Sequence, residues 1–273
     1  MCQACIIESV KSNMLSRRSL FSAASGMAAG AAALAMGATA ARPALAQSSG
    51  RVIDLTHPWD EKFPTFDGLP GITYEPDKVL DRDGYQLWKL TIFEHSGTHI
   101  DAPLHFSADG ASVDELPASG LICPLCVIDL TAKAAEDANA MVEPEDIEAF
   151  ITAHGQIPAG AVVAMHSGWA AKLADPSYRT DADGNFAFPG FSGAATEMLA
   201  GMDVAGIGVD TLSLDPGNSA DFAVHNSWLP GGRYGIENLA GLDQVPATGA
   251  TIFVGAPTHR RGTGGPARIL AVV

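Results

Sequence analysis

His95-Ser-Gly-Thr-His99-Ile-Asp101-Ala-Pro-Leu-His105-Phe106 is the most informative stretch of the chain, and it follows a run at residues 86–94 whose composition predicts a strand. Gly97 and Pro103 disfavour a helix in this stretch. Side chains alternate along an extended segment, so we expect residues 95, 97, 99 and 101 to share one face. Gly97 then leaves a gap between two imidazoles and a carboxylate.

The alternation predicts a metal site at His95, His99 and Asp101. Three ligands leave coordination positions open, as catalytic rather than structural metals require. Pro103 turns the chain, so His105 can reach back towards the open side without being a ligand itself. Core packing has no need of so many polar side chains in one short stretch, and we therefore interpret the cluster as a functional site.

The other histidines and the cysteines have more ordinary interpretations. His154 and His259 are assigned to the surface, and His57, which precedes a proline, to a turn. Cys123 and Cys126 form a Cys-Pro-Leu-Cys sequence inside a run that predicts a buried strand, and no second cysteine pair completes a zinc site. We expect structural thiols or a disulfide here rather than a redox motif.

The first 46 residues have the pattern of a twin-arginine signal peptide. Ser16-Arg-Arg-Ser-Leu-Phe21 precedes an uncharged run rich in alanine and glycine, and Ala44-Leu-Ala46 is a small-x-small cleavage signal. A membrane-spanning helix is the alternative, but the run is barely long enough and contains little leucine or isoleucine. We expect a cleaved leader, a single mature domain at residues 47–273, and a periplasmic location.

The formal net charge is −15, and the leader contains four of the 16 basic residues but one of the 31 acidic residues, so the mature chain is more acidic still. Such a surface repels nucleic acid and anionic lipid, so neither is expected as a partner. No segment after residue 47 is apolar for long enough to cross a membrane.

Short apolar runs predict strands, and two helices have clear boundary signals. Pro144 can occupy the first turn of one helix, which ends at Gly155, and Ser192 can cap a second helix that ends at Gly201. Many strands with few helices indicate a mixed α/β domain. The predicted strands lie at residues 52–55, 86–94, 126–130, 161–166, 206–209, 251–254 and 269–273.

The pattern His-x-Gly-Thr-His-x-Asp-x-Pro-x-His resembles the signature of the cyclase superfamily, which includes bacterial kynurenine formamidase and isatin hydrolase. Asp54-Leu-Thr-His-Pro58 and Gly208-Val-Asp-Thr-Leu-Ser-Leu-Asp215 resemble two further shared segments. The resemblance implies a mixed sheet in a barrel-like, swivelling β/β/α domain. It also implies a homodimer or larger homo-oligomer.

The resemblance further implies roles for individual residues. The first metal would be held by His95, His99 and Asp101, and His105 would transfer protons. Asp101 could bridge to a second metal completed by His225 and Glu237. Alternatively, a single manganese would be bound, and His225 and Glu237 would contact its ligands without binding the metal themselves. Either Mn²⁺ or Zn²⁺ suits such ligands. Aromatic residues of the N-terminal segment would line the pocket of the neighbouring protomer, or would only pack that segment against the fold. They are Trp59, Phe63 and Phe66.

These roles predict a metal-dependent hydrolase that opens a cyclic amide, such as an isatin-like lactam, by attack of metal-bound hydroxide. A divalent metal lowers the pKa of bound water from about 15.7 towards 7. The alternative activity is that of an arylformamidase acting on N-formylkynurenine, which export of the protein disfavours. Two other classes remain open: a non-haem iron oxygenase, and a non-catalytic periplasmic protein that binds a metal or small ligand.

Overall fold

The computed structural model describes residues 50–273, so the predicted leader at residues 1–46 and its cleavage site lie outside the described part of the chain. The described residues group into two compact units, one formed by residues 74–90 and the other by residues 50–73 together with 91–273. No helix in residues 50–273 is long and apolar enough to cross a membrane. Every candidate site residue belongs to the larger unit.

The smaller unit is the greater part of a β-hairpin. Its strands are β2 (Ile72–Lys78) and β3 (Leu87–Ile92), and the connection contains the short helix α3 (Leu80–Asp83). Gly84 ends this helix with a φ of 80°, which glycine adopts without strain. The strand predicted at residues 86–94 is confirmed, but every residue of β3 is exposed, so it contributes nothing to a core within this chain.

The larger unit contains a mixed sheet whose nine described strands follow the order β1-β13-β11-β5-β7-β9-β10-β4-β12. Strands β5, β7, β9 and β10 are parallel in its middle, and the outer pairs are antiparallel. A separate parallel pair is formed by β6 (Met141–Val142) and β8 (Gly190–Phe191). The strands of the large sheet are β1 (Val52–Asp54), β4 (His99–Asp101), β5 (Ile122–Asp129), β7 (Val162–His166), β9 (Gly206–Val209), β10 (Tyr234–Glu237), β11 (Ala250–Gly255), β12 (Gly264–Pro266) and β13 (Arg268–Val272).

This sheet curls until its two ends meet. β12 lies at one end of the strand order and β13 near the other, yet only Ala267 separates them in the chain. A bridge between Thr56, just after β1, and Leu239, just after β10, joins the same two regions. The mixed α/β class and the barrel-like sheet expected from the sequence are therefore confirmed.

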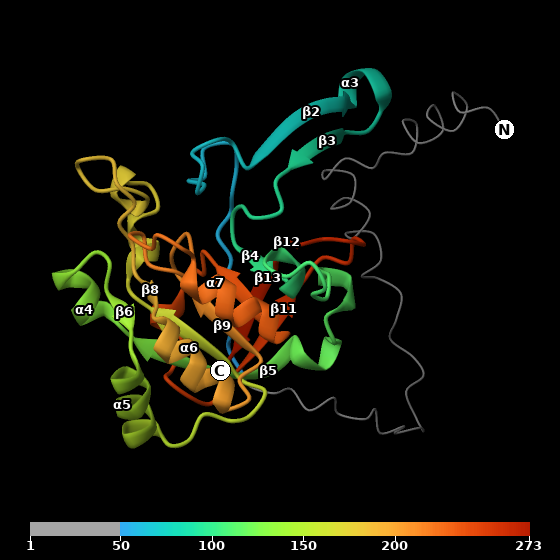
Figure 1. Ribbon diagram of the computed structural model, residues 1–273. Helices are drawn as coiled ribbons and strands as arrows, with labels where there is room; N and C mark the ends of the chain where they lie inside the picture. Colours follow the sequence, from blue (N-terminus) through green and yellow to red (C-terminus); the bar gives the residue numbers. More distant parts are fainter. Residues whose placement is uncertain (1–49) are drawn as a thin grey trace, which may run out of the picture. The chain divides into compact units, whose positions relative to one another are not determined.

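Alternate residues of the central strands contribute to two different cores. In β7, Val162 and Ala164 pack inside the curled sheet, whereas Val163 and Met165 pack on its other face. Helices cover that other face (Figure 1). They include α5 (Pro144–His154), α6 (Gly193–Gly201) and α7 (Ala223–Trp228), and a further short helix, α4, spans Thr131–Glu136.

The two predicted helices are confirmed together with their boundary signals. Pro144 occupies the first turn of α5, where its missing N–H costs no hydrogen bond, and Gly155 follows the last residue of the helix. The Ser192 hydroxyl accepts a hydrogen bond from the backbone N–H of Ala195 and so caps α6. Both helices thus begin and end where local chemistry allows, and their apolar faces bury against the sheet.

Cys123 and Cys126 are both free and buried. They lie three residues apart on β5, so their side chains point to opposite faces: Cys123 belongs to the core inside the sheet, and Cys126 to the core beneath the helices. Burial raises the pKa of the Cys126 thiol to about 11. The two residues are structural thiols and form no disulfide in this structure.

Candidate metal centre

The antiparallel pairing of β4 with β10 brings the separated parts of the site together. Glu237 lies directly opposite His99, and Gly235 lies opposite Asp101. A Cβ atom on Gly235 would come within 3.2 Å of the Asp101 carboxylate, so glycine leaves room for that group. The distant histidine, His225, is supplied by α7.

The prediction that residues 95–101 are extended is wrong for its first half. Only His99–Asp101 form a strand, and residues 94–98 form a bend in which Gly97 has a φ of 65°. A Cβ atom on Gly97 would lie 3.0 Å from the ring of Trp59. The bend turns His95 towards Asp101 although the chain does not alternate there, so the three predicted ligands still meet.

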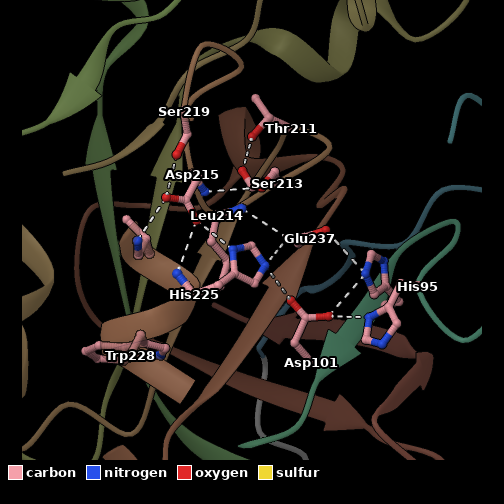
Figure 2. A network of polar contacts seen from close by, with 12 residues as sticks. His95, Asp101, Thr211, Ser213, Leu214, Asp215, Ser219, His225, Trp228 and Glu237 are labelled. Carbon is pink, nitrogen blue, oxygen red and sulfur yellow. Dashed lines mark hydrogen bonds and ion pairs between the residues drawn. The ribbon is translucent and has the colours of Figure 1, made fainter. Parts of the chain in front are cut away.

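Asp101 is the centre of the polar cluster, as Figure 2 shows. One carboxylate oxygen lies 2.7 Å from His95 Nδ1 and 3.3 Å from His99 Nε2. The other oxygen faces His225 Nε2 at 3.7 Å. Glu237 completes the group, with one oxygen 3.3 Å from His99 Nε2 and the other 3.3 Å from His225 Nε2. All five predicted metal-site residues therefore converge on one buried region.

Hydrogen bonds determine which nitrogen of two of these imidazoles faces the centre. His99 Nδ1 lies 2.9 Å from the backbone oxygen of Gly97, which can only accept, so this nitrogen carries the proton. His225 Nδ1 lies 2.6 Å from the carboxylate of Asp215 and is a donor for the same reason. In the neutral state both rings then present an unprotonated Nε2 to the cluster, which is the form that binds a metal.

The chemistry of the cluster fits a cation. His99 Nε2 and one oxygen of Asp101 are buried without a hydrogen-bond partner among the described residues. Burial would lower the pKa of His99, but the nearby carboxylates of Asp101 and Glu237 raise it to about 10. Buried carboxylates therefore demand positive charge here, and two groups of side chains can supply metal ligands: His95, His99 and Asp101, and Asp101, His225 and Glu237.

Asp215 holds His225 in place from behind. Its carboxylate accepts hydrogen bonds from the imidazole of His225, from the backbone N–H of His225 at 3.1 Å, and from that of Val224 at 2.9 Å. Burial would raise the pKa of Asp215, but these bonds keep it below its ordinary value, so the group stays a carboxylate. Glu237 is fixed similarly by the backbone N–H of Leu214 at 3.0 Å (Figure 2).

His105 ends a 3₁₀ turn that begins at Pro103 and stacks on His95, with the two ring centres 3.7 Å apart. Burial lowers its pKa to about 4, and the nearby histidines His95 and His225 act in the same direction against the acidic groups. At neutral pH the ring is therefore uncharged and can accept a proton. The structure thus places His105 beside the predicted ligands in a form suited to proton transfer.

A cavity of about 260 Å³ opens beside the polar cluster, and aromatic side chains form its wall. Phe222 lies 5.8 Å from Phe66 and 5.9 Å from Phe106, measured between ring centres. Arg179 holds this wall from outside, because its guanidinium donates hydrogen bonds to the backbone oxygen of Phe66 at 2.9 and 3.2 Å. The site therefore combines a polar floor with an apolar wall.

The three N-terminal aromatic residues lie in different surroundings. Phe66 lines the cavity, and 37% of its surface is exposed. Phe63 is buried, with its ring 6.0 Å from that of His57, and Trp59 packs on Gly97. Trp59 and Phe63 are not on the cavity wall of their own chain. A role in a neighbour's pocket stays a prediction.

Sequence reasoning missed several residues that support the site. Asp215 was recognised only as part of a shared segment, and Phe222 and Asn238 were not recognised. Asn238 donates from its side chain to the oxygen of Gly97 at 3.0 Å and so holds the bend that carries His95. Phe106 directly follows the His-x-Gly-Thr-His-x-Asp-x-Pro-x-His signature, so its position in the sequence could have indicated that it lies at the site. The others act through contacts that sequence spacing does not encode.

Comparisons with known proteins agree with this geometry. Residues 53–216 match the family described as putative cyclase. The isatin hydrolase of Roseibium aggregatum is 32% identical over 216 residues, covering 75% of this chain and 82% of that protein. The kynurenine formamidase of Salinibacter ruber is 29% identical over 174 residues, covering 64% of this chain and 74% of that protein. This chain belongs to the cyclase family.

A solved structure supports the same assignment. Isatin hydrolase A from Labrenzia aggregata, bound to benzyl benzoate, superposes with a TM-score of 0.78 at 34% identity, covering 84% of this chain and 96% of that one. The family resemblance inferred from the His-x-Gly-Thr-His-x-Asp pattern is confirmed, and so is the expectation that the chain is a hydrolase.

Replacing Asp215 by asparagine should weaken metal binding by about 10- to 100-fold, because the amide cannot give the charged acceptor that orients the His225 ring. Competition between the protein and a chromogenic chelator for Zn²⁺ and for Mn²⁺ measures the change. Asp221→Asn, at an exposed position near the same helix, is the matched control and should bind like the wild type. Equal affinities for all three proteins would contradict the orienting role.

Proposed function

We propose that this protein is a metal-dependent hydrolase that opens the ring of a neutral cyclic amide of the isatin type. The observation that carries the proposal is the buried cluster of acceptor atoms around Asp101, next to a cavity with an aromatic wall. The similarity to proteins named isatin hydrolase supports the substrate class.

A divalent metal, Mn²⁺ or Zn²⁺, would supply an activated water and a positive charge for the carbonyl oxygen that becomes negative during the attack. His95, His99 and Asp101 would hold it. Asp101, His225 and Glu237 have the geometry for a second ion. Histidine and carboxylate ligands suit both metals.

The side chains around the metal divide the remaining work. His105 lines the same cavity and is uncharged at neutral pH, so it can take the proton of the attacking water and return it to the leaving nitrogen. Phe66, Phe106 and Phe222 can hold a flat aromatic ring against the polar floor and keep water away from it. The reacting carbonyl would then point towards the ligand cluster.

The alternative substrate, N-formylkynurenine, is supported by relatives named kynurenine formamidase. That molecule carries an amino-acid carboxylate. No lysine or arginine occurs among the described residues that line the cavity, so the wall offers no fixed cation for this group. The lining thus favours a substrate without a carboxylate.

The first experiment compares isatin with N-formylkynurenine on the mature protein loaded with Mn²⁺ or with Zn²⁺. We expect ring opening of isatin, seen as loss of its visible absorbance, which stops after chelation and returns on adding metal. Turnover that persists in protein shown by elemental analysis to be metal-free would contradict the metal. Turnover of N-formylkynurenine but not of isatin would contradict the proposed substrate and support the formamidase hypothesis.

Replacing His105 by glutamine should lower kcat by about 10²- to 10⁴-fold, because no other proton acceptor replaces the ring. Metal content, measured by elemental analysis, should stay that of the wild type. His154→Gln is the control, since this histidine lies at the exposed end of α5. Wild-type turnover of the His105 variant with its metal retained would refute the assignment.

We further propose that two copies associate through the hairpin, and that the leader exports the folded chain to the periplasm. The apolar side chains of β3 support the association, because Leu87 is 48% exposed, Trp88 47% and Leu90 45%. A second copy of the same hairpin would remove this apolar surface from water. The Arg17-Arg18 pair supports export by the twin-arginine route.

Expressed in a bacterium with a twin-arginine system, the protein should be recovered from the periplasmic fraction with the mass of a dimer. The double variant R17K/R18K should stay in the cytoplasm. Immunoblotting of fractions and light scattering after gel filtration measure the two properties. A monomer would contradict the association, and periplasmic recovery of the double variant would contradict the export route.

A further inference from the structure

A row of polar side chains connects His95 to the protein surface. His95 Nε2 lies 2.9 Å from the hydroxyl of Thr263, and this hydroxyl lies 2.6 Å from a carboxylate oxygen of Glu94. The other oxygen of Glu94 lies 2.6 Å from Nε2 of His259. The side chain of His259 is 48% exposed and that of Glu94 34%, so the row runs from solvent to the candidate metal centre.

The donors and acceptors along this row can be arranged in one way. A glutamate is ionised at neutral pH and only accepts hydrogen bonds. The single hydroxyl proton of Thr263 therefore goes to Glu94, and the hydroxyl oxygen is left as an acceptor. His95 Nε2 must then carry a proton. Nδ1, which lies 2.7 Å from Asp101, faces the centre, and it is the nitrogen that would give its lone pair to a metal bound there.

The backbone around Thr263 is shaped to make this contact. A Cβ atom on Gly264 would collide with the backbone oxygen of Ile100 and would lie 2.7 Å from the His95 ring. One on Gly262 would lie 2.5 Å from the His259 ring. Glycines on both sides of Thr263 thus let this segment lie directly against both histidines. A threonine held there only for packing would not need them.

We propose that Thr263, Glu94 and His259 form a positioning network that fixes the orientation and tautomer of His95 and so sets its strength as a metal ligand. Each ligand histidine then has its own partner: a backbone oxygen for His99, Asp215 for His225, and a hydroxyl backed by a carboxylate for His95. The inference rests on the proposed metal site.

The network predicts a graded loss of affinity. Thr263→Val, which keeps the shape but removes the hydroxyl, should weaken Zn²⁺ and Mn²⁺ binding by about 10- to 100-fold. Thr263→Ser, which restores the hydroxyl, should recover most of the affinity. Glu94→Gln should also weaken binding, because an amide can donate to Thr263 and release its proton towards His95. His259→Gln should have the smallest effect, since its contact is partly in solvent.

The affinities are measured by chelator competition, and the visible spectrum of the Co²⁺-loaded protein reports the geometry of the ligands independently of activity. Thr131→Val is the matched control, because this threonine makes a similar hydroxyl–carboxylate bond of 2.6 Å with Asp129 away from the site. The melting temperature of each metal-free variant separates misfolding from a changed ligand. A Thr263→Val protein that melts early leaves Glu94→Gln to decide the question.

Two results would overturn the network, and they differ. If the wild type binds metal and both Thr263→Val and Glu94→Gln bind it equally well, His95 needs no such support, while the proposed function stands. If the wild type binds neither Zn²⁺ nor Mn²⁺, the metal site itself is wrong and the network has no ligand to position.

Discussion

The site depends on one electrostatic constraint: two carboxylates and three imidazoles meet in a mostly buried region beside the cavity. Asp101 and Glu237 are both nearly fully buried, and neither forms an ion pair with a lysine or arginine within residues 50–273. Burying ionised groups without compensation costs several kcal/mol for each ion. The pairing of β4 with β10 forces this proximity, because it puts Glu237 opposite His99. Hydrogen bonds from Leu214 to Glu237, and from His225 and His99 to their acceptors, then fix the orientation of these side chains.

Much of this site could be read from the sequence because its first half is local. His95, His99 and Asp101 lie within seven residues, and their residue types alone indicate metal chemistry. The three ligands meet for a reason that their spacing does not contain: the chain bends at Gly97 instead of remaining extended, and Trp59 and Asn238 hold that bend. The family resemblance, and not periodicity, identified the distant half of the site.

Elements with strong local signals were predicted well, and short elements were not. The caps of α5 and α6 act within one turn, so the sequence contains them. β4 has only three residues, and in β10, Tyr-Gly-Ile-Glu, two strand-favouring residues alternate with two that disfavour strands. Both segments are strands because backbone pairing with neighbouring strands of the sheet holds them extended. Likewise, α7 begins after Phe222, which has a left-handed backbone conformation and no capping side chain of its own. The first-turn N–H groups of Val224 and His225 are instead bound by Asp215, which lies earlier in the chain.

The closure of the sheet has a consequence for how the protein is made. Val52 pairs with Val272, 220 positions later, and the chain passes directly from β12, which lies against β4, to β13, which lies against β1. The barrel cannot close until these late strands have left the ribosome, and pairing at such long range is slow because the loop entropy is lost first. β12 is one of these late strands and pairs with β4 directly beside Asp101, so the backbone around the carboxylate cluster is among the last parts of the sheet to be completed.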